Sequence, residues 1–372
     1  YNDGIFPATR DLALMIPMQD ANVLAIDHLP TSWMTAVSEG LLLSELGERI
    51  EDESWLDSWR LVSARFTVCS PLGRIANTEE IDRLCWPQAR FVWQPVIESI
   101  AIHGLIRPYY SDDRAIHTLY AVDHTAIERS KMVKFIAEGG RLDELSSEEL
   151  FTFEQARDRA GRTILEALYH LRQSEGPYHG FLERPEFYDT NETAEFQRKL
   201  GSFMERFATP EALHELTAFS LPLGRNPASS DLWSFIGFSG RDGVITPATL
   251  NVLDAQTGDL LFSFESSEDV TTGLGDEELT DALKKMPPVQ RDRLSAQVIT
   301  DTQQLNSHLD RINDPYQTLV AHTTCSSCHR ANNLNFNFHN LSYLEDQEMS
   351  ISPRVINDVS RDRALARALW FK

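Results

Sequence analysis

Long apolar runs are absent from this sequence. A membrane-spanning helix needs roughly 18 consecutive apolar residues, and the best candidate stretch, residues 12–26, is interrupted by Asp20 and Asn22. A transmembrane segment is therefore not expected. No secretory signal peptide is visible either.

Positive charge is in deficit. The chain has 34 Lys and Arg against 56 Asp and Glu, which gives a formal net charge of −22 at pH 7. The acidic residues are spread along the chain rather than gathered in one tail. Such a surface repels nucleic acid and anionic membranes and favours solubility or basic partners, so nucleic acid is not expected as a partner.

Several enzyme motifs are missing as well. The sequence contains no phosphate-binding loop, no G-x-G-x-x-G, no G-x-S-x-G and no EF-hand pattern. Internal repeats and low-complexity tracts are also absent. Residues 1–287 therefore offer no motif that assigns them a role, and whether the chain is an enzyme stays open.

The most informative feature that is present is the pentapeptide Cys325-Ser326-Ser327-Cys328-His329. C-x-x-C-H is the pattern of c-type haem attachment, in which two thiols bond to the haem edge and the adjacent imidazole reaches the iron. With 4 Cys and 11 His in 372 residues, chance would produce this pattern on the order of once in a thousand such chains. The pattern therefore indicates one covalent haem c.

Two other interpretations of this motif are possible. A thioredoxin-like pair also uses C-x-x-C, but there the first Cys follows a strand, whereas residues 314–323 have helical spacing behind Asp314-Pro315. A zinc site needs four ligands. His322 or His339 could join the two thiols, but no second C-x-x-C or H-x-x-x-H pair completes the set.

Residues 296–372 resemble the single-haem, all-helical c-type cytochromes. In that family a helix delivers C-x-x-C-H, a loop wraps the haem, and a Met shortly before the last helix closes the other axial position. The resemblance implies that Cys325 and Cys328 anchor the haem, that His329 is the proximal iron ligand and that Met349 is the distal ligand, with His339 as the alternative. No Gly-x-Met-Pro type ligand loop is present, and the interval from His329 to Met349 is short.

The expected fold is α+β, with two domains. Residues 1–287 mix strand and helix patterns, and residues 288–372 form a small all-α haem domain that ends in a helix after Ser352-Pro353. The expected strands are 61–69, 89–97, 115–122, 231–239, 246–254 and 259–265, the last two joined as a hairpin. Apolar stripes predict helices over residues 153–171 and 196–207.

The other two cysteines are expected to form a disulfide. Cys69 ends one alternating stretch and Cys85 comes just before the next, so adjacent strands would bring the two residues together. An oxidised pair is typical of an exported protein. Free buried thiols are the alternative.

Three further histidines are interpreted as structural rather than metal-binding. His117 lies within an alternating strand pattern, and His170 and His214 lie in segments expected to be helical. Isolated histidines at such positions have no ligand spacing to support a metal site.

Together these features predict an exported, single-haem c-type cytochrome that acts in electron transfer with a redox partner protein. The expected location is periplasmic or extracellular in a bacterial-type cell, Tyr1 is expected to start a processed chain, and a lipid anchor remains compatible with the sequence. One alternative is a haem-containing binding or scaffold subunit of a cell-envelope complex. Another is a haem peroxidase-like enzyme, which would need an open iron position.

Overall fold

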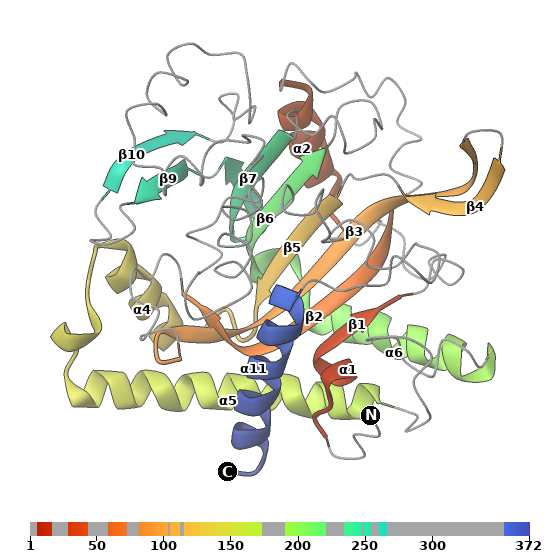
Figure 1. The fold of residues 1–372 in the computed structure, drawn as a ribbon. Helices are drawn as coiled ribbons and strands as arrows, with labels where there is room; N and C mark the ends of the chain where they lie inside the picture. The colour runs from red at the N-terminus through yellow and green to blue at the C-terminus, as the bar shows by residue number, and fades with distance from the viewer. Residues whose placement is uncertain are drawn as a thin grey trace, which may run out of the picture.

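The computed structural model describes residues 6–16, 29–43, 59–72, 82–102, 105–111, 115–172, 190–220, 234–247, 249–253, 260–265 and 353–372. Its centre is an antiparallel sheet, crossed by helices on both faces and along one end (Figure 1). The sequence-based strand and helix predictions that fall within these residues are largely confirmed.

Seven strands form the main sheet. Their order is β1 (Ala13–Met15), β2 (Trp59–Pro71), β3 (Cys85–Ile102), β5 (Ala115–Ala121), β6 (Leu213–Ser220), β7 (Ser234–Arg241) and β8 (Val244–Pro247). The strand β4 (Leu105–Ser111) pairs with the far half of β3. A separate pair joins β9 (Thr249–Leu253) to β10 (Leu260–Glu265), which confirms the predicted hairpin pairing.

One face of the sheet is apolar and forms the core. The register aligns a row across the strands from β2 to β8, consisting of Ala64, Phe91, Thr118, Leu216, Phe238 and Pro247. Successive side chains of a strand point to opposite faces, so the alternation of apolar and polar residues in the sequence places the apolar ones on one face of the sheet. Thr118 is fully buried in this row, and its hydroxyl accepts a hydrogen bond from Trp93 Nε1 at 3.1 Å.

The helix α6 (Thr190–Phe207) packs on the apolar face, where the ring centroids of Phe203 and Phe66 lie 5.0 Å apart. The helix α2 (Thr31–Leu43) contacts β6 and β7, and its buried Trp33 donates a hydrogen bond to the Gly243 carbonyl at 3.0 Å. The contacts of α6 use the apolar stripe that the sequence pattern of residues 196–207 predicts.

The longest helix, α5 (Ser147–Leu171), runs along one end of the sheet (Figure 1). It begins at a capping box in which Glu149 N donates to Ser146 Oγ at 3.2 Å and Ser146 N donates to Glu149 Oε2 at 3.0 Å. Its buried stripe includes Phe153, which packs against Trp86 with ring centroids 5.7 Å apart. The stripe therefore serves as core, as predicted.

Shorter elements complete the described fold. They are α1 (Thr9–Leu12), α4 (Ile127–Ala137) and two single turns of 3-10 helix, η4 (Leu142–Glu144) and η6 (Pro210–Ala212). The strand β6 corrects the interpretation of His214, which lies in this strand and not in a helix. No helix in the described ranges is long and apolar enough to cross a membrane.

The last helix overturns the predicted fold class. A separate all-α cytochrome domain would hold residues 353–370 apart from the sheet, but α11 (Pro353–Trp370) packs directly on β2, α5 and α1. At the α5 crossing, a Cβ placed on Gly161 would lie 2.5 Å from Leu369 Cδ2. The helix is therefore part of the sheet structure. The predicted boundary at residues 287 and 288 lies outside the described residues.

Candidate functional site

The residues predicted to hold a haem lie outside the described residues. These are Cys325, Cys328, His329, Met349 and the alternative ligand His339. Within the described part of the chain, no group of three or more His, Cys, Asp or Glu side chains could hold a metal ion. The described structure resumes at Pro353, four residues after Met349, where α11 begins. The contacts of this helix are therefore the described features nearest in sequence to the predicted haem ligands.

The predicted disulfide is confirmed. Cys69 in β2 and Cys85 at the start of β3 are bonded, with their Cα atoms 4.8 Å apart. Both residues are buried, Cys85 completely. The bond closes the connection between the two strands, and it engages two of the 4 cysteines in the chain.

Ion pairs attach α11 to the neighbouring strand. Asp362 Oδ2 lies 2.7 Å from Arg65 Nη2, and Asp362 Oδ1 accepts a hydrogen bond from Thr67 Oγ1 at 2.8 Å. Asp358, one helical turn earlier, lies 3.2 Å from Arg65 Nη1. Burial opposes the charge on Arg65, but Asp362 and Asp358 outweigh that effect, so the pKa of the guanidinium is raised.

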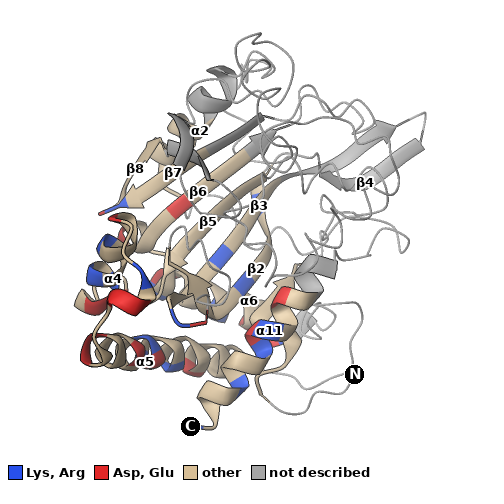
Figure 2. Ribbon diagram, turned by 60° about the vertical axis from the view of Figure 1, so that its left-hand side comes forward, with Lys and Arg blue, Asp and Glu red and all other residues tan. Residues whose placement is uncertain are grey.

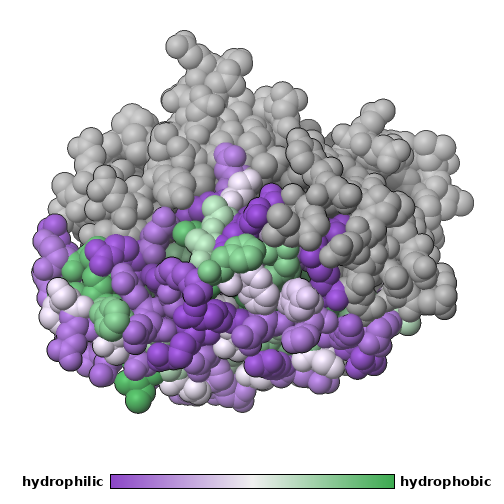
Figure 3. All heavy atoms as spheres, turned by 90° about the horizontal axis from the view of Figure 1, so that it is seen from below, coloured by the Kyte–Doolittle hydropathy of each residue, from purple (hydrophilic) through white to green (hydrophobic). Residues whose placement is uncertain are grey.

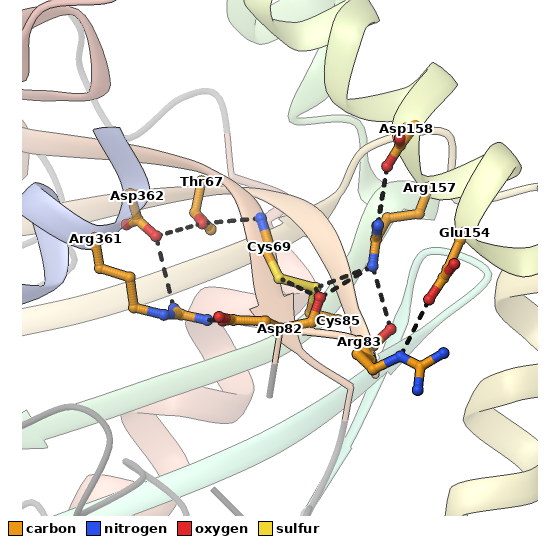
Figure 4. Close-up of a disulfide and its surroundings, with 10 residues drawn as sticks. All are labelled: Thr67, Cys69, Asp82, Arg83, Cys85, Glu154, Arg157, Asp158, Arg361 and Asp362. Carbon is orange, nitrogen blue, oxygen red and sulfur yellow. Dashed lines mark hydrogen bonds and ion pairs between the residues drawn. A yellow bond between two sulfur atoms is a disulfide. The ribbon is translucent and has the colours of Figure 1, made fainter. Parts of the chain in front are cut away.

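The same ion pairs reach the disulfide (Figure 4). The Thr67 hydroxyl that donates to Asp362 also accepts a hydrogen bond from Cys69 N at 3.1 Å. Next to Asp362 on α11, Arg361 pairs with Asp82, just before β3. The disulfide and the last helix therefore hold the end of β2 and the start of β3 together.

A second arginine binds the same connection from α5. Arg157 Nη1 donates to the carbonyl oxygens of Asp82 and Arg83, at 3.1 and 3.3 Å, and Arg157 Nη2 lies 3.0 Å from Asp158 Oδ1 (Figure 4). Arg83 in turn lies 3.3 Å from Glu154. The connection before β3 is thus fixed by α5 and by α11 at once.

The face of the sheet opposite the apolar core is polar. A row in register across the strands from β2 to β8 consists of Arg65, Arg90, Leu119, Glu215, Ser239 and Thr246. Figure 2 shows basic positions along β2 and β3 and acidic colouring on β6, in line with this row. The helix α11 lies over its β2 end, through the Arg65 ion pairs.

Two histidines on this polar face are kept neutral. Burial lowers the pKa of His117 to about 3, and Arg90 adds to the effect. Burial also lowers the pKa of His214 to about 3, with further contributions from Arg129 and Arg90. Neither is grouped with metal-ligating side chains in the described residues, so the structural interpretation of both histidines is consistent with their surroundings.

Sequence reasoning missed the residues that attach α11. A possible signal was the pair Asp358 and Asp362, which are four residues apart and share one side of a helix. Nothing local identifies their partner, because Arg65 is separated from Asp362 by 297 positions. The role of Gln88 was missed for the same reason: it contacts Ser70 and His214, on two other strands.

Where its residues are described, the surface seen from the side of α5 is mainly hydrophilic, with apolar patches among the polar residues (Figure 3). Exposed apolar side chains in the described residues include Phe151 and Phe371. Scattered residues of this kind are normal on a globular surface.

No protein-family model matches this chain, and neither the curated proteins nor the solved structures include a significant match.

Proposed function

We propose that this chain is an exported single-haem c-type cytochrome that acts in electron transfer. The observation that carries the proposal is the sequence Cys325-Ser326-Ser327-Cys328-His329. In this proposal the two thiols anchor one haem c covalently, and the His329 imidazole is the proximal ligand of its iron. Bound haem would supply one-electron iron chemistry, while the protein sets its potential through ligands, burial and hydrogen bonds.

The donor set suits this cofactor. The disulfide joins Cys69 to Cys85, so Cys325 and Cys328 are the two cysteines that remain of the 4 in the chain. A zinc site made of four cysteine thiolates is ruled out by that arithmetic. A zinc ion bound by two thiolates and two histidines would also use Cys325 and Cys328. The two cofactors are distinguished by their attachment, because haem c is bonded covalently to the thiols and zinc is not.

The sixth iron ligand decides what the haem can do. Met349 is the first candidate and His339 the second. A Met/His iron has a raised potential and suits electron transfer, whereas an open position permits peroxide or small-ligand chemistry. The helix α11 begins four residues after Met349 and is docked on β2, so the end of the proposed haem segment is tethered to the sheet.

The proposed location is the periplasm or the outside of a bacterial-type cell. The buried disulfide supports it, because such bonds persist in oxidising compartments and are rare in the cytosol. A redox partner protein is proposed with it, and with a net charge of −22 a basic docking surface on that partner would be favoured.

A second candidate function is a haem-containing binding or scaffold subunit of a cell-envelope complex. The observation that favours it is the extent of the sheet structure, since electron transfer alone does not require seven strands and their covering helices. A peroxidase-like enzyme is the third possibility, and it requires an open iron with a distal acid/base residue.

Titration of the reduced protein with carbon monoxide separates these functions. Electron transfer through a six-coordinate iron predicts that carbon monoxide leaves the visible spectrum of the reduced haem almost unchanged. Ready binding, with a shift of the main haem band at low carbon monoxide concentration, would contradict this proposal and favour small-ligand or peroxide chemistry. A reversible one-electron titration of the same sample supplies the potential.

A further inference from the structure

The helix α11 crosses the polar face of the sheet in a defined direction (Figure 1). Asp358 pairs with Arg65 at 3.2 Å, and Asp362, one helical turn later, also accepts a hydrogen bond from Thr67 at 2.8 Å. Later residues of the helix thus contact later residues of β2, so the two elements run the same way. The start of α11 therefore points toward the part of β2 that precedes Arg65, where Ser63 lies.

The first residue of α11 is displaced from Arg65 by about one row of the sheet. Between Pro353 and Asp358 the helix rises by about 7.5 Å, and two residues of a strand span about 6.6 Å. The next row of the polar face in that direction consists of Ser63, Val92, His117 and Thr217. All four side chains are half-buried. The chain that enters α11 at Pro353 therefore arrives over this row.

This row is shielded from water. Burial is the largest cause of the lowered pKa of His117, which falls to about 3, and Val92 adds an apolar side chain to the same row. The ion pair of Asp362 with Arg65 holds α11 on β2, at one end of the row. Further chain over β3 and β5 would account for the burial of His117.

The charges beside the row favour an acidic segment. Arg90 of β3 is the register partner of Arg65, and like charges opposite each other on two strands are destabilising. Asp358 and Asp362 of α11 compensate the charge of Arg65. Glu215, an acidic residue of the same face, lies on β6, two strands across from β3. Carboxylates that reach the face near the start of α11 would therefore be favoured next to Arg90.

The sequence just before α11 supplies such carboxylates. Glu345, Asp346 and Glu348, called the acidic run here, precede Pro353 without an intervening Lys or Arg. The chain from Glu348 to Pro353 can span up to about 17 Å, at roughly 3.4 Å per residue. Neighbouring strands are only about 4.8 Å apart. The acidic run can therefore reach Arg90 on β3 from the start of α11.

We propose that residues 345–352 dock on the polar face of the sheet over β2, β3 and β5, with the acidic run beside Arg90 and the chain over the row that contains His117. The docking uses residues of this chain and requires no haem. Its consequence rests on the proposed function: Met349 belongs to this segment, so the haem would lie against the sheet. The positive charge of Arg90 would then favour the reduced iron.

Coupling with a water-soluble carbodiimide tests the docking in the full-length protein, because this reagent joins an amine to a carboxylate that it touches. Arg90→Lys supplies the amine at position 90. Trypsin separates the candidate carboxylates, since the acidic run lies in the peptide 331–354 and Asp358 in the peptide 355–361. The proposal predicts a link from position 90 to the peptide 331–354. The absence of this link, or a link to other peptides only, would overturn the docking.

A matched variant on the opposite face makes the test specific. Arg198→Lys supplies the same amine on α6, which packs on the apolar face, and Glu195 is its neighbour there. Coupling to Glu195 is expected in this variant and shows that the reaction works, whereas coupling to the peptide 331–354 is not expected. Equal yields of the peptide 331–354 link from both variants would show an unspecific reaction and overturn the docking.

The haem potential provides a second readout and separates the docking from the proposed function. In the haem-loaded protein, Arg90→Met should lower the midpoint potential, and Arg198→Met should leave it unchanged. Equal potentials in the parent and Arg90→Met would overturn the placement of the haem against this face. A parent whose intact mass contains no haem would contradict the proposed function only, and the coupling result then decides the docking.

Discussion

Asp362 Oδ2 lies 2.7 Å from Arg65 Nη2, although the two residues are separated by 297 positions in the chain. The carboxylate is almost completely buried, and its Oδ1 atom also accepts a hydrogen bond from Thr67 Oγ1 at 2.8 Å. This contact makes the last helix a part of the sheet structure. It also connects that helix to the disulfide, through the hydrogen bond from Cys69 N to Thr67.

Removal of the Asp362 carboxylate is predicted to destabilise the protein strongly. Asp362→Ala should lower the free energy of unfolding by roughly 3–5 kcal/mol, because it leaves the Arg65 charge without one of its two partners. Urea denaturation measures the change. Asp358→Ala should have a smaller effect, since Asp358 is more exposed.

An exposed ion pair provides the control. Glu195 and Arg198 on α6 lie 2.6 Å apart, but both are well exposed, and surface pairs of this kind contribute little. Glu195→Ala should leave the denaturation midpoint unchanged. If Asp362→Ala also left the denaturation midpoint unchanged, the Arg65 ion pair would not hold α11 on β2 as described.

The disulfide is predicted to contribute about 3 kcal/mol to the free energy of unfolding, because it closes a loop with a sequence separation of 16. Cys69→Ser combined with Cys85→Ser should lower the denaturation midpoint accordingly. Peptide mapping without reduction should recover the peptides of Cys69 and Cys85 linked together. Alkylation of both residues under denaturing, non-reducing conditions would show that the bond is absent.

Stability is predicted to fall as the solution is acidified below about pH 6.5. Burial lowers the pKa of His117 and of His214 to about 3 in the folded protein. Between pH 6.5 and 3 the unfolded chain therefore binds more protons than the folded one, so lower pH favours unfolding. Each histidine contributes at most about 1.4 kcal/mol per pH unit in this window.

Urea denaturation at a series of pH values measures this dependence. Replacing both His117 and His214 with Gln should flatten the curve between pH 6.5 and 4. Replacing His170, which is exposed on α5, with Gln is the control. This variant should leave the dependence of stability on pH unchanged. A slope that is the same in the double variant and the parent would mean that other groups control acid stability.

The sixth-ligand proposal predicts a spectral effect at Met349. Met349→Ala should free the iron position, lower the haem potential and allow carbon monoxide to bind, because the thioether favours reduced iron. Visible spectra and redox titration measure these changes. If Met349→Ala matches the parent while His339→Ala alters both readouts, the iron is held by two histidines and a low-potential electron-transfer role follows.

Local patterns predicted much of the fold. The alternation in residues 61–69, 89–97 and 115–122 corresponds to β2, β3 and β5, and the apolar stripes correspond to α5 and α6. The disulfide was predictable because its two cysteines lie at neighbouring strand ends. In each case the signal lies within a short stretch of sequence.

The arrangement of distant segments was not predictable in this way. An amphipathic helix such as α11 can pack on any apolar surface, and its partner on β2 is fixed by the Arg65, Thr67 and Asp362 contacts. The strand β6 was missed because its register shift next to His214 interrupts the alternation.

Intact mass under denaturing conditions tests the central claim most directly. From a host able to mature c-type cytochromes, the protein should exceed its polypeptide mass by one haem. The addition should persist in Cys69→Ala combined with Cys85→Ala and vanish in Cys325→Ala combined with Cys328→Ala, although each variant loses two cysteines. A parent mass equal to that of the bare polypeptide would contradict the haem proposal and favour zinc or a second disulfide at Cys325 and Cys328.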